Sequence, residues 1–313
     1  MQKLKQQFQL IQAMRDFFNE QGFMDVLTPP MVENPGMETH IHPFAIHSAK
    51  GEFAGKYLHT SPEFHMKELL SLGLENIFTI CYCFRDEPNS LLHRQQFLML
   101  EWYRSEARYE TIMDDCENLY SFCYERLNSK KLNINFERVT VNEIIKEYTG
   151  KDILDFLETE QLRKWLEKDF KDIMLPPLET NPSWDDYFFL LFLNKVEPEL
   201  KKRPFITLYE YPHHLSALST LKEKDPRVCE RFEIYINGIE IANCFNELRD
   251  INEQKKRFSK QAQEKRKLYG YSLPGPKLLY DTLDKGFSPS AGIALGIERL
   301  LMGITGKNDV FYS

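Results

Sequence analysis

The stretch Phe84-Arg85-Asp86-Glu87, followed by His93-Arg94-Gln95-Gln96-Phe97, decides the fold of this chain. An apolar run, Ile77 to Phe84, precedes it and a second, Phe97 to Tyr103, follows, so the pattern predicts two strands joined by a polar loop. Arginine is the planar, permanently charged donor that suits a phosphate or carboxylate. We therefore expect this hairpin to hold a nucleoside triphosphate; the alternative is a surface hairpin with an ordinary salt bridge.

The segments before the hairpin predict an amphipathic helix over residues 3–21, ended by Gly22, and then a short strand from Phe23 to Leu27. Residues 31–55 are expected to form loops because they contain Pro35-Gly36 and Pro43. Ser61-Pro62-Glu63 is expected to open a helix that runs from Phe64 to Leu72.

The segments after the hairpin begin with a mostly helical block, residues 105–200, which we interpret as an insertion within one domain spanning 1–313. Strands are predicted for Phe205–Tyr209 and Arg231–Ile236; Asn237-Gly238 predicts a tight turn and a return strand to about Phe245. Asp250 and Glu253 predict the start of a helix to about Tyr269, and Ala291 to Gly303 predicts a glycine-bearing strand that turns into a helix. Hairpin-joined strands with added helices indicate an α+β class, an antiparallel sheet flanked by helices.

The composition indicates an ordinary globular protein. The chain has 313 residues, a net charge of −7 and six cysteines. No apolar run reaches the ~18 residues of a membrane helix, and the N-terminus lacks a secretory signal, so we expect a cytoplasmic protein without membrane contact. The acidic balance argues against an extensive RNA-binding surface. Cys81-x-Cys83 lies in an apolar strand pattern, and we interpret the cysteines as reduced and buried rather than as disulfides or zinc ligands.

Four groups of residues suggest chemistry together: the Arg85 hairpin, Glu240 with Glu247, the segment Gly292 to Arg299, and Ser61-Pro62-Glu63. Each alone has a structural explanation. Joining a carboxylate to the α-phosphate of ATP brings two anions together, which an arginine must neutralise. Glu240 and Glu247 would supply hard oxygen ligands for Mg²⁺. Because they are seven residues apart on a predicted strand, a bulge must intervene, and we expect it within Asn243 to Asn246.

The chain resembles the catalytic domain of class II aminoacyl-tRNA synthetases of the lysyl type, because all three class signatures occur in order. Gly22-Phe23-Met24-Asp25-Val26-Leu27-Thr28-Pro29 is similar to the first, the Arg85 hairpin to the second, and Gly292 to Arg299 to the third. Segments typical of the lysine enzymes are Glu230-Arg231-Phe232-Glu233, Asn237-Gly238-Ile239-Glu240-Ile241-Ala242-Asn243 and Asn246-Glu247-Leu248. The resemblance implies the class II catalytic fold, an aminoacyl-adenylate chemistry and a homodimer formed through the first signature.

The resemblance also assigns residues to roles. It implies Arg85 as the catalytic residue, ATP as a substrate and Mg²⁺ as a cofactor, with Glu240 and Glu247 as metal ligands. The implied amino-acid contacts are Ser61, Pro62, Glu63, Glu101, Tyr103 and Glu247. The implied ATP contacts are Arg85, Asp86, Glu87, His93, Arg94, Phe97, Glu240, Ile241, Gly296 and Arg299.

The acceptor is expected to be a protein rather than tRNA. The lysyl enzymes carry an anticodon-binding barrel before the first signature, whereas this sequence starts at the helix leading into that signature. It therefore resembles the truncated paralogues that attach (R)-β-lysine to a lysine of elongation factor P, and no stable tRNA binding is expected. Ala294, where the lysyl enzymes usually have glycine, fits a β-amino substrate. We expect the basic helix that contains Lys255, Lys256, Arg257, Lys260, Lys265, Arg266 and Lys267 to contact the acceptor, with a solvated helix face as the alternative.

Some residues depart from this family. Arg94 stands where the paralogues use an asparagine at ATP, Gln96 replaces a carboxylate, and the segment containing His213-His214 differs from a small-residue run. Two other functions stay open: acylation of tRNA with a separate RNA-binding partner, and a synthetase-like regulatory subunit without turnover. The retained Arg85, Glu240, Glu247 and Arg299 argue against the second.

Overall fold

The structure, a computed structural model, describes residues 2–132 and 134–311. Met1, Asn133, Tyr312 and Ser313, which the predicted span of 1–313 includes, lie outside these residues. The chain divides into two compact units, one made of residues 1–134 and 246–313 and the other of residues 135–245. The predicted insertion, 105–200, therefore does not coincide with one unit, because the helix α3 (Tyr109–Asn128) belongs to the first.

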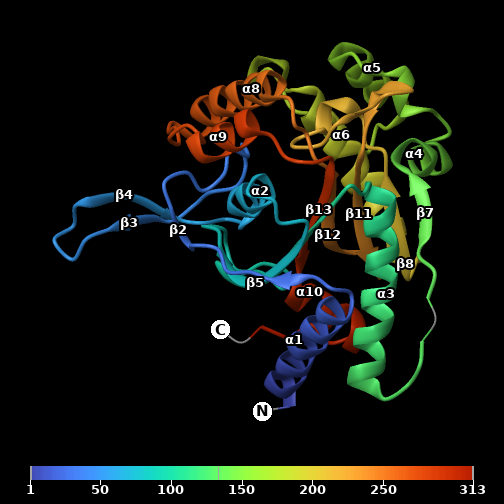
Figure 1. The fold of residues 1–313 in the computed structure, drawn as a ribbon. Helices are drawn as coiled ribbons and strands as arrows, with labels where there is room; N and C mark the ends of the chain where they lie inside the picture. The colour runs from blue at the N-terminus through green and yellow to red at the C-terminus, as the bar shows by residue number, and fades with distance from the viewer. Residues whose placement is uncertain (1, 133, 312–313) are drawn as a thin grey trace. The chain divides into compact units, whose positions relative to one another are not determined.

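The first unit is built on an antiparallel hairpin of β5 (Asn76–Phe84) and β6 (Gln96–Ser105), which confirms the two strands predicted around the Arg85 loop (Figure 1). The strand order in this unit is β1 (Met24–Asp25), β5, β6 and β13 (Ser290–Gly296), with β1 parallel to β5 and the other pairs antiparallel. The predicted strand Phe23–Leu27 is thus only two residues long.

Alternation along β5 and β6 separates a core face from an open face. Phe78 and Trp102 point to the core face, where Phe18 of α1 (Gln2–Glu20) packs against both rings at 4.8 and 5.2 Å between centroids. Helix α1 ends as predicted, with Gly22 in the left-handed region at φ +75°. Helix α1 also contacts α3 and α10 (Ile297–Thr305), so these helices line the core side.

The segment predicted as loop between residues 31 and 55 is partly wrong. It contains β2 (Met31–Val32), β3 (Ala45–His47) and the start of β4 (Phe53–Leu58), which form an antiparallel sheet that projects from the first unit (Figure 1). Most of these strand residues are exposed, so no buried alternation marks them in the sequence. The unit also contains α2 (Glu63–Ser71), α8 (Ile251–Tyr269) and α9 (Lys277–Lys285), of which α2 and α8 confirm predicted helices.

The second unit has the strand order β12 (Ile239–Asn246), β11 (Arg231–Ile236), β8 (Phe205–Tyr209) and β7 (Glu137–Thr140). Asn237 and Gly238 join β11 to β12 with φ of +51° and +77°, as the Asn-Gly pair predicts. A register shift places one extra residue, Ile241, between Glu240 and Ala242. The predicted bulge therefore exists, but its predicted position within Asn243 to Asn246 is wrong.

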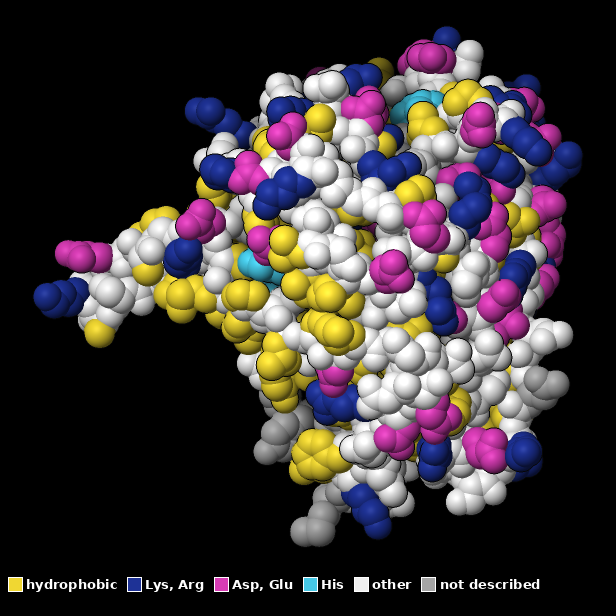
Figure 2. All heavy atoms as spheres, viewed as in Figure 1, with side chains coloured by type: hydrophobic (Ala, Val, Ile, Leu, Met, Phe, Trp, Pro, Cys, Tyr) yellow, Lys and Arg dark blue, Asp and Glu magenta, His cyan; other side chains and the backbone are white. Residues whose placement is uncertain are grey.

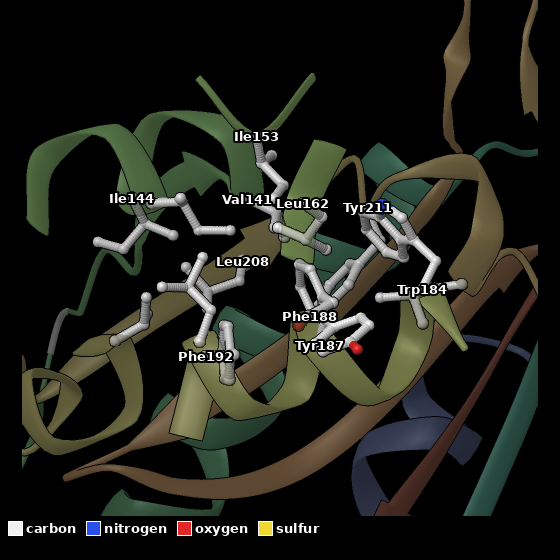
Figure 3. Packing of buried hydrophobic residues seen from close by; sticks show 14 of the residues in the cluster. Val141, Ile144, Ile153, Leu162, Trp184, Tyr187, Phe188, Phe192, Leu208 and Tyr211 are labelled. Atoms are coloured by element: carbon white, nitrogen blue, oxygen red, sulfur yellow. The ribbon is translucent and has the colours of Figure 1, made fainter. Parts of the chain in front are cut away.

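The core of the second unit is apolar and aromatic. Phe188 and Phe192 pack with Leu208 of β8 and with helix residues such as Leu162 (Figure 3). The helical elements are α4 (Val141–Thr149), α5 (Thr159–Asp169), α6 (Trp184–Leu191), a π-helical turn η3 (Phe192–Val196) and α7 (Glu197–Leu200). Single 3₁₀ turns are η1 (Ile153–Asp155), η2 (Leu178–Thr180) and η4 (His213–Leu215), and β9 (Leu221–Lys222) pairs with β10 (Asp225–Cys229).

No helix in the described part of the chain is long and apolar enough to span a membrane. Cys83, Cys116, Cys123, Cys229 and Cys244 are buried as predicted, whereas Cys81 is half-buried.

Candidate active site

The open face of the β5–β6 hairpin brings together predicted site residues. The cross-strand pairs on this face are Thr79 with Glu101, Cys81 with Met99, and Cys83 with Phe97. Strand β13 extends the face, because Gly292, Ala294 and Gly296 lie opposite Tyr103, Glu101 and Met99. Because these β13 residues are small, they leave the open face uncovered beside Glu101 and Tyr103.

A buried triad of Glu63, Lys67 and Glu247 lies in the same unit. Glu63 and Lys67 are one turn apart on α2, and the Lys67 Nζ lies 2.7 Å from Glu63 Oε1 and 2.6 Å from Glu247 Oε2. Burial raises the pKa of Glu63, and it raises that of Glu247 to about 8. Burial alone would lower the pKa of Lys67, but Glu247 and Glu63 together raise it above its ordinary value.

Glu101 and Tyr103 add a second buried acidic element. The Tyr103 hydroxyl donates to Glu101 Oε1 at 2.9 Å, while Glu101 Oε2 is buried without a partner among the described residues. Burial and then the charge of Glu63 raise the pKa of Glu101 far above its ordinary value. The unit thus buries three acids, of which Glu63 and Glu247 contact Lys67. An unpaired buried carboxylate oxygen is costly unless a donor such as an ammonium group binds it.

Gly292 allows the close approach of two of these groups. A Cβ at this position would lie 2.1 Å from Tyr103 Cε1 and 2.7 Å from Glu247 Oε1. Glycine is therefore required here by space, and the third signature and the predicted amino-acid contacts Tyr103 and Glu247 meet at this point.

The other predicted amino-acid contacts lie at the start of α2. Pro62 is the residue before the first helical turn, and its carbonyl oxygen accepts a hydrogen bond from the Met66 amide at 3.0 Å. Pro62 and Glu63 are buried, whereas Ser61 is half-buried. The helix start thus fixes the position of Glu63 beside Lys67.

The Arg85 side chain lies at the other end of the open face. Its guanidinium is 5.2 Å from the centroid of the Phe97 ring, and its Nε is buried without a hydrogen-bond partner among the described residues. The backbone of the loop is fixed by Arg85 N–H to the Gln95 carbonyl at 2.9 Å and by Asp86 N–H to the His42 carbonyl at 2.7 Å. A half-buried guanidinium with an unused donor is suited to an anion.

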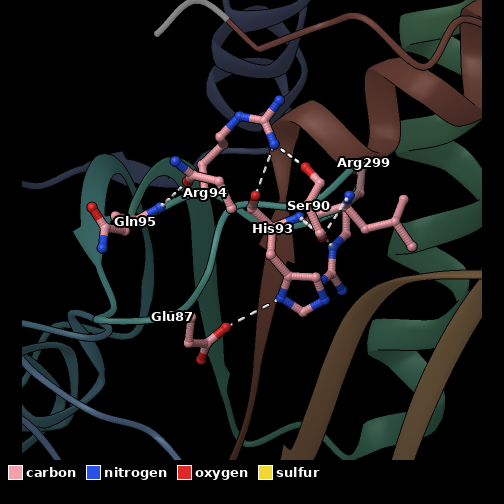
Figure 4. A network of polar contacts seen from close by, with 8 residues as sticks. Glu87, Ser90, His93, Arg94, Gln95 and Arg299 are labelled. Carbon is pink, nitrogen blue, oxygen red and sulfur yellow. Dashed lines mark hydrogen bonds and ion pairs between the residues drawn. The ribbon is translucent and has the colours of Figure 1, made fainter.

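Glu87, His93 and Arg299 form a polar network next to this loop (Figure 4). His93 Nδ1 lies 3.2 Å from Glu87 Oε2, and His93 Nε2 lies 3.5 Å from Arg299 Nη2. The hydrogen bond from His93 lowers the pKa of Glu87. One histidine tautomer satisfies both contacts, donating from Nδ1 and accepting at Nε2. The second and third signatures are therefore in contact at His93 and Arg299.

Arg94 is held by its own loop. Its Nη1 donates to the carbonyl oxygens of Ser90 and His93, and its guanidinium lies 4.4 Å from the centroid of the Phe311 ring (Figure 4). These contacts give a structural role to the residue that departs from the family pattern. Gln95 and Asp86 complete the loop through a side-chain contact of 3.4 Å.

Glu240 and Ile241 lie on β12 in the second unit, with Ile241 buried at the bulge. The predicted metal pair of Glu240 and Glu247 therefore falls on two different units. Glu247 is paired with Lys67, with 2.6 Å between Glu247 Oε2 and Lys67 Nζ. This contact links Glu247 to Glu63 and Lys67, next to the other residues predicted to bind the amino acid.

Sequence reasoning missed Lys67 and a buried network around Glu233. Glu233 Oε2 accepts from the Tyr211 and Tyr235 hydroxyls, each at 2.6 Å, and Glu233 Oε1 is 2.5 Å from Arg231 Nη2. The spacing of Glu63 and Lys67, four residues apart, was the available signal for the triad, but the same spacing is typical of exposed helix pairs.

Residues 1–311 match the family model of class II tRNA synthetases (D, K and N), so the chain belongs to this family and the predicted class II fold is confirmed. Similar proteins include elongation factor P–(R)-β-lysine ligases from three bacteria. The Mannheimia succiniciproducens protein is 32% identical over 304 residues, which cover 96% of this chain and 90% of that protein. The Pseudoalteromonas translucida protein is 33% identical over 98% of this chain and 92% of its own length. The Vibrio atlanticus protein is 33% identical over 98% of this chain and 93% of its own length.

Proposed function

We propose that this protein activates (R)-β-lysine with ATP and transfers it to a lysine side chain of elongation factor P. The observation that carries this proposal is the set of three buried acids, in which Glu63 and Glu247 pair with Lys67 and Glu101 accepts a hydrogen bond from Tyr103. A lysine-like substrate brings two ammonium groups, which match the excess of acid in this cluster. The names of the similar proteins supply the substrate and acceptor.

In the first proposed step, a carboxylate oxygen of the amino acid attacks the α-phosphorus of ATP. The bond from that phosphorus to the bridging oxygen breaks, and pyrophosphate leaves. Arg85 is proposed to bind both anions and to stabilise the charge that develops between them. Its unused Nε donor and its position at the end of the open face support this role.

The remaining ATP contacts are proposed on the same basis. His93 would hold the terminal phosphates, and Arg299 and Phe97 would stack on the two faces of the adenine. The proposed set also includes Asp86, Glu87, Arg94, Glu240, Ile241 and Gly296. Magnesium would neutralise charge on the phosphates, with Glu240 and Glu247 as its proposed ligands.

In the second proposed step, the ε-amine of the acceptor lysine attacks the carbonyl carbon of the adenylate. The bond to the AMP oxygen breaks, AMP leaves, and the amine loses a proton to solvent. We place this reaction in the cytoplasm, with elongation factor P as partner. Incubation with ATP, (R)-β-lysine and elongation factor P should raise the mass of elongation factor P by one β-lysyl group; labelled amino acid on tRNA instead would support the tRNA alternative.

A homodimer through the first signature is also proposed. Met24, Leu27 and Met31 are large apolar residues that are more than half exposed in this unit. Figure 2 shows further hydrophobic side chains along the projecting β3–β4 sheet and on the surface below it. Exposed apolar surface of this kind is typical of an interface, and sedimentation of the purified protein should give twice the monomer mass.

A further inference from the structure

His59, Cys81 and Cys83 form a cluster that the proposed reaction does not use. One potential ligand atom from each residue lies within 4.8 Å of the others, and within the described ranges this is the one such cluster found of three His, Cys, Asp or Glu side chains. His59 and Cys83 are buried and Cys81 is half-buried, so Cys81 is the member of the cluster that solvent can reach.

The strand geometry explains how the thiols meet. Cys81 and Cys83 are two residues apart on β5, so both side chains point to the open face. Met99 lies opposite Cys81 on β6, and its sulfur is 3.7 Å from Cys83 Sγ. The cluster therefore contains two thiols, one thioether and one imidazole.

His59 is oriented as a metal-ligating histidine would be. Its Nε2 lies 2.7 Å from the Tyr82 carbonyl oxygen, so this nitrogen carries the proton and donates it. Its Nδ1 is then the unprotonated acceptor, and this atom is buried without a hydrogen-bond partner that meets standard geometry. A ring nitrogen fixed by a backbone carbonyl, with the other lone pair left for a ligand, is the usual arrangement around protein-bound metals. The Phe84 amide also donates to the His59 carbonyl at 3.1 Å, which fixes this segment to β5.

We propose that His59, Cys81 and Cys83 bind a thiophilic d¹⁰ metal ion such as Zn²⁺ or Cu⁺. Soft thiolate and thioether ligands select such ions over Mg²⁺. Both sulfur atoms would bind the ion as thiolates, and any proton still on a thiol would leave to solvent. Met99 supplies a further sulfur, which Cu⁺ uses and Zn²⁺ rarely does.

The position of the site gives it a consequence that rests on the proposed function. Cys81 lies between Thr79 and Cys83 on the face whose partners on β6 are Glu101, Met99 and Phe97. A bound ion thus sits between the acidic cluster and Arg85. Metal binding is expected to inhibit adenylate formation by occupying the face along which the amino acid and ATP would meet.

Metal binding is tested without any assay of activity. The reduced, metal-free protein is titrated with Zn²⁺ or Cu⁺ in competition with a chromophoric chelator, and Cd²⁺ is used to observe thiolate charge-transfer absorption. We expect one ion per chain, with binding weakened at least about 100-fold in the C81S/C83S double variant and weakened also in H59Q. The C123S variant, which changes a buried cysteine on α3, should bind as the wild type does. The M99L variant should weaken Cu⁺ binding and leave Zn²⁺ binding unchanged.

The proposal is overturned if the wild-type protein does not bind, or if C81S/C83S binds as well as wild type. Because a variant can fail to fold, a second measurement uses wild type alone: Zn²⁺ should protect Cys81 from alkylation, as mapped by mass spectrometry, and unprotected Cys81 at saturating Zn²⁺ contradicts the proposal. Pyrophosphate exchange with and without Zn²⁺ then tests the inhibition. An inactive protein that still binds the ion would refute the proposed function and leave the metal site standing.

Discussion

At the scale of single residues, Arg85 carries the proposed chemistry. Replacing it with alanine removes the guanidinium that would bind both reacting anions, and we expect the rate of adenylate formation to fall by roughly 10²–10³-fold or more. Arg85→Lys keeps the charge but loses the planar fork, so it should recover only part of the rate. Single-turnover adenylation with a matched unfolding curve is the measurement. A rate in Arg85→Ala within twofold of wild type would remove Arg85 from the mechanism.

Gly292 is the second residue with a sharp prediction. In Gly292→Ala the new methyl group would overlap the Tyr103 ring and the Glu247 carboxylate. We expect a loss of about 1–3 kcal/mol in unfolding free energy from overpacking, and a rise in KM for the amino acid but not for ATP. Gly296→Ala is the control for stability, because its nearest neighbour outside the chain-adjacent residues is an Arg299 carbon at 3.6 Å. An unchanged KM for the amino acid in Gly292→Ala would show that Gly292 does not contribute to the amino-acid site.

Some of the site residues could be predicted from the sequence and others could not. Arg85 and Phe97 were predicted from the second signature, and Glu63 from the Ser61-Pro62-Glu63 segment that precedes it. Lys67 could not, since nothing local distinguishes a lysine inserted between two buried acids from one on an exposed helix face. The second of those acids, Glu247, is far away in the sequence, and only the fold brings it within 2.6 Å of Lys67.

At the scale of elements, the buried hairpin strands and the Asn237-Gly238 turn were predictable because apolar runs and turn residues act locally. The β2–β4 sheet was missed because its strands are short and exposed. The bulge was placed wrongly because a one-residue register shift depends on the partner strand, and the sequence of β12 alone does not contain it. Helix α8 was predicted with the right cap: the Asp250 side chain accepts from the amides of Asn252 and Glu253.

Glu298 links two elements and gives a pH prediction. This buried residue at the start of α10 accepts the Leu98 amide of β6 at 3.1 Å, and burial raises its pKa to about 7. In the unfolded chain the same group titrates near its ordinary value of 4.5. Protonated Glu298 therefore stabilises the folded state relative to the unfolded chain. This contribution is fully present below about pH 4.5 and is lost as the pH rises through about 7.

The measurement is urea unfolding of wild type and Glu298→Gln over pH 4.5–8. Glutamine keeps an acceptor oxygen but does not titrate, so the difference between the two proteins isolates this group. We expect the wild type to lose about 3 kcal/mol more than the variant over this range. Parallel pH profiles would show that Glu298 does not titrate as the structure implies.

At the scale of the whole molecule, the proposed contact with the protein acceptor is expected to use the basic surface of α8. Helix α8 presents exposed Lys255, Lys256, Lys260, Arg266 and Lys267, and Figure 2 shows basic side chains over α8 and α9 among acidic ones. Lys265, which was expected to belong to this surface, is buried, and its Nζ donates to the Ile41 carbonyl at 2.7 Å. Arg257 is half-buried and paired with Glu253 at 2.9 Å. The predicted contact surface is therefore narrower than the sequence indicated.

Charge reversal at Lys256, Lys260, Arg266 and Lys267 should lower kcat/KM for modification of elongation factor P at least about tenfold at low salt. Pyrophosphate exchange should stay unchanged. The reason is that these charges would attract the protein acceptor electrostatically, whereas adenylate formation does not depend on them. Reversal of Lys164 and Lys168 on α5 serves as a control of the same type. Equal modification rates in the α8 variant and wild type at low salt would exclude this surface.

The most direct test of the central claim is ATP–pyrophosphate exchange with (R)-β-lysine and α-lysine side by side. We expect the exchange rate with either lysine to be well above the rate with an amino acid of the same length that lacks a side-chain amine. The rate with (R)-β-lysine should exceed the rate with α-lysine. Ala294 lies opposite Glu101, so Ala294→Gly should shift this preference toward α-lysine. Exchange with neither lysine by a folded wild-type protein would contradict the claim that this site forms a lysyl-type adenylate.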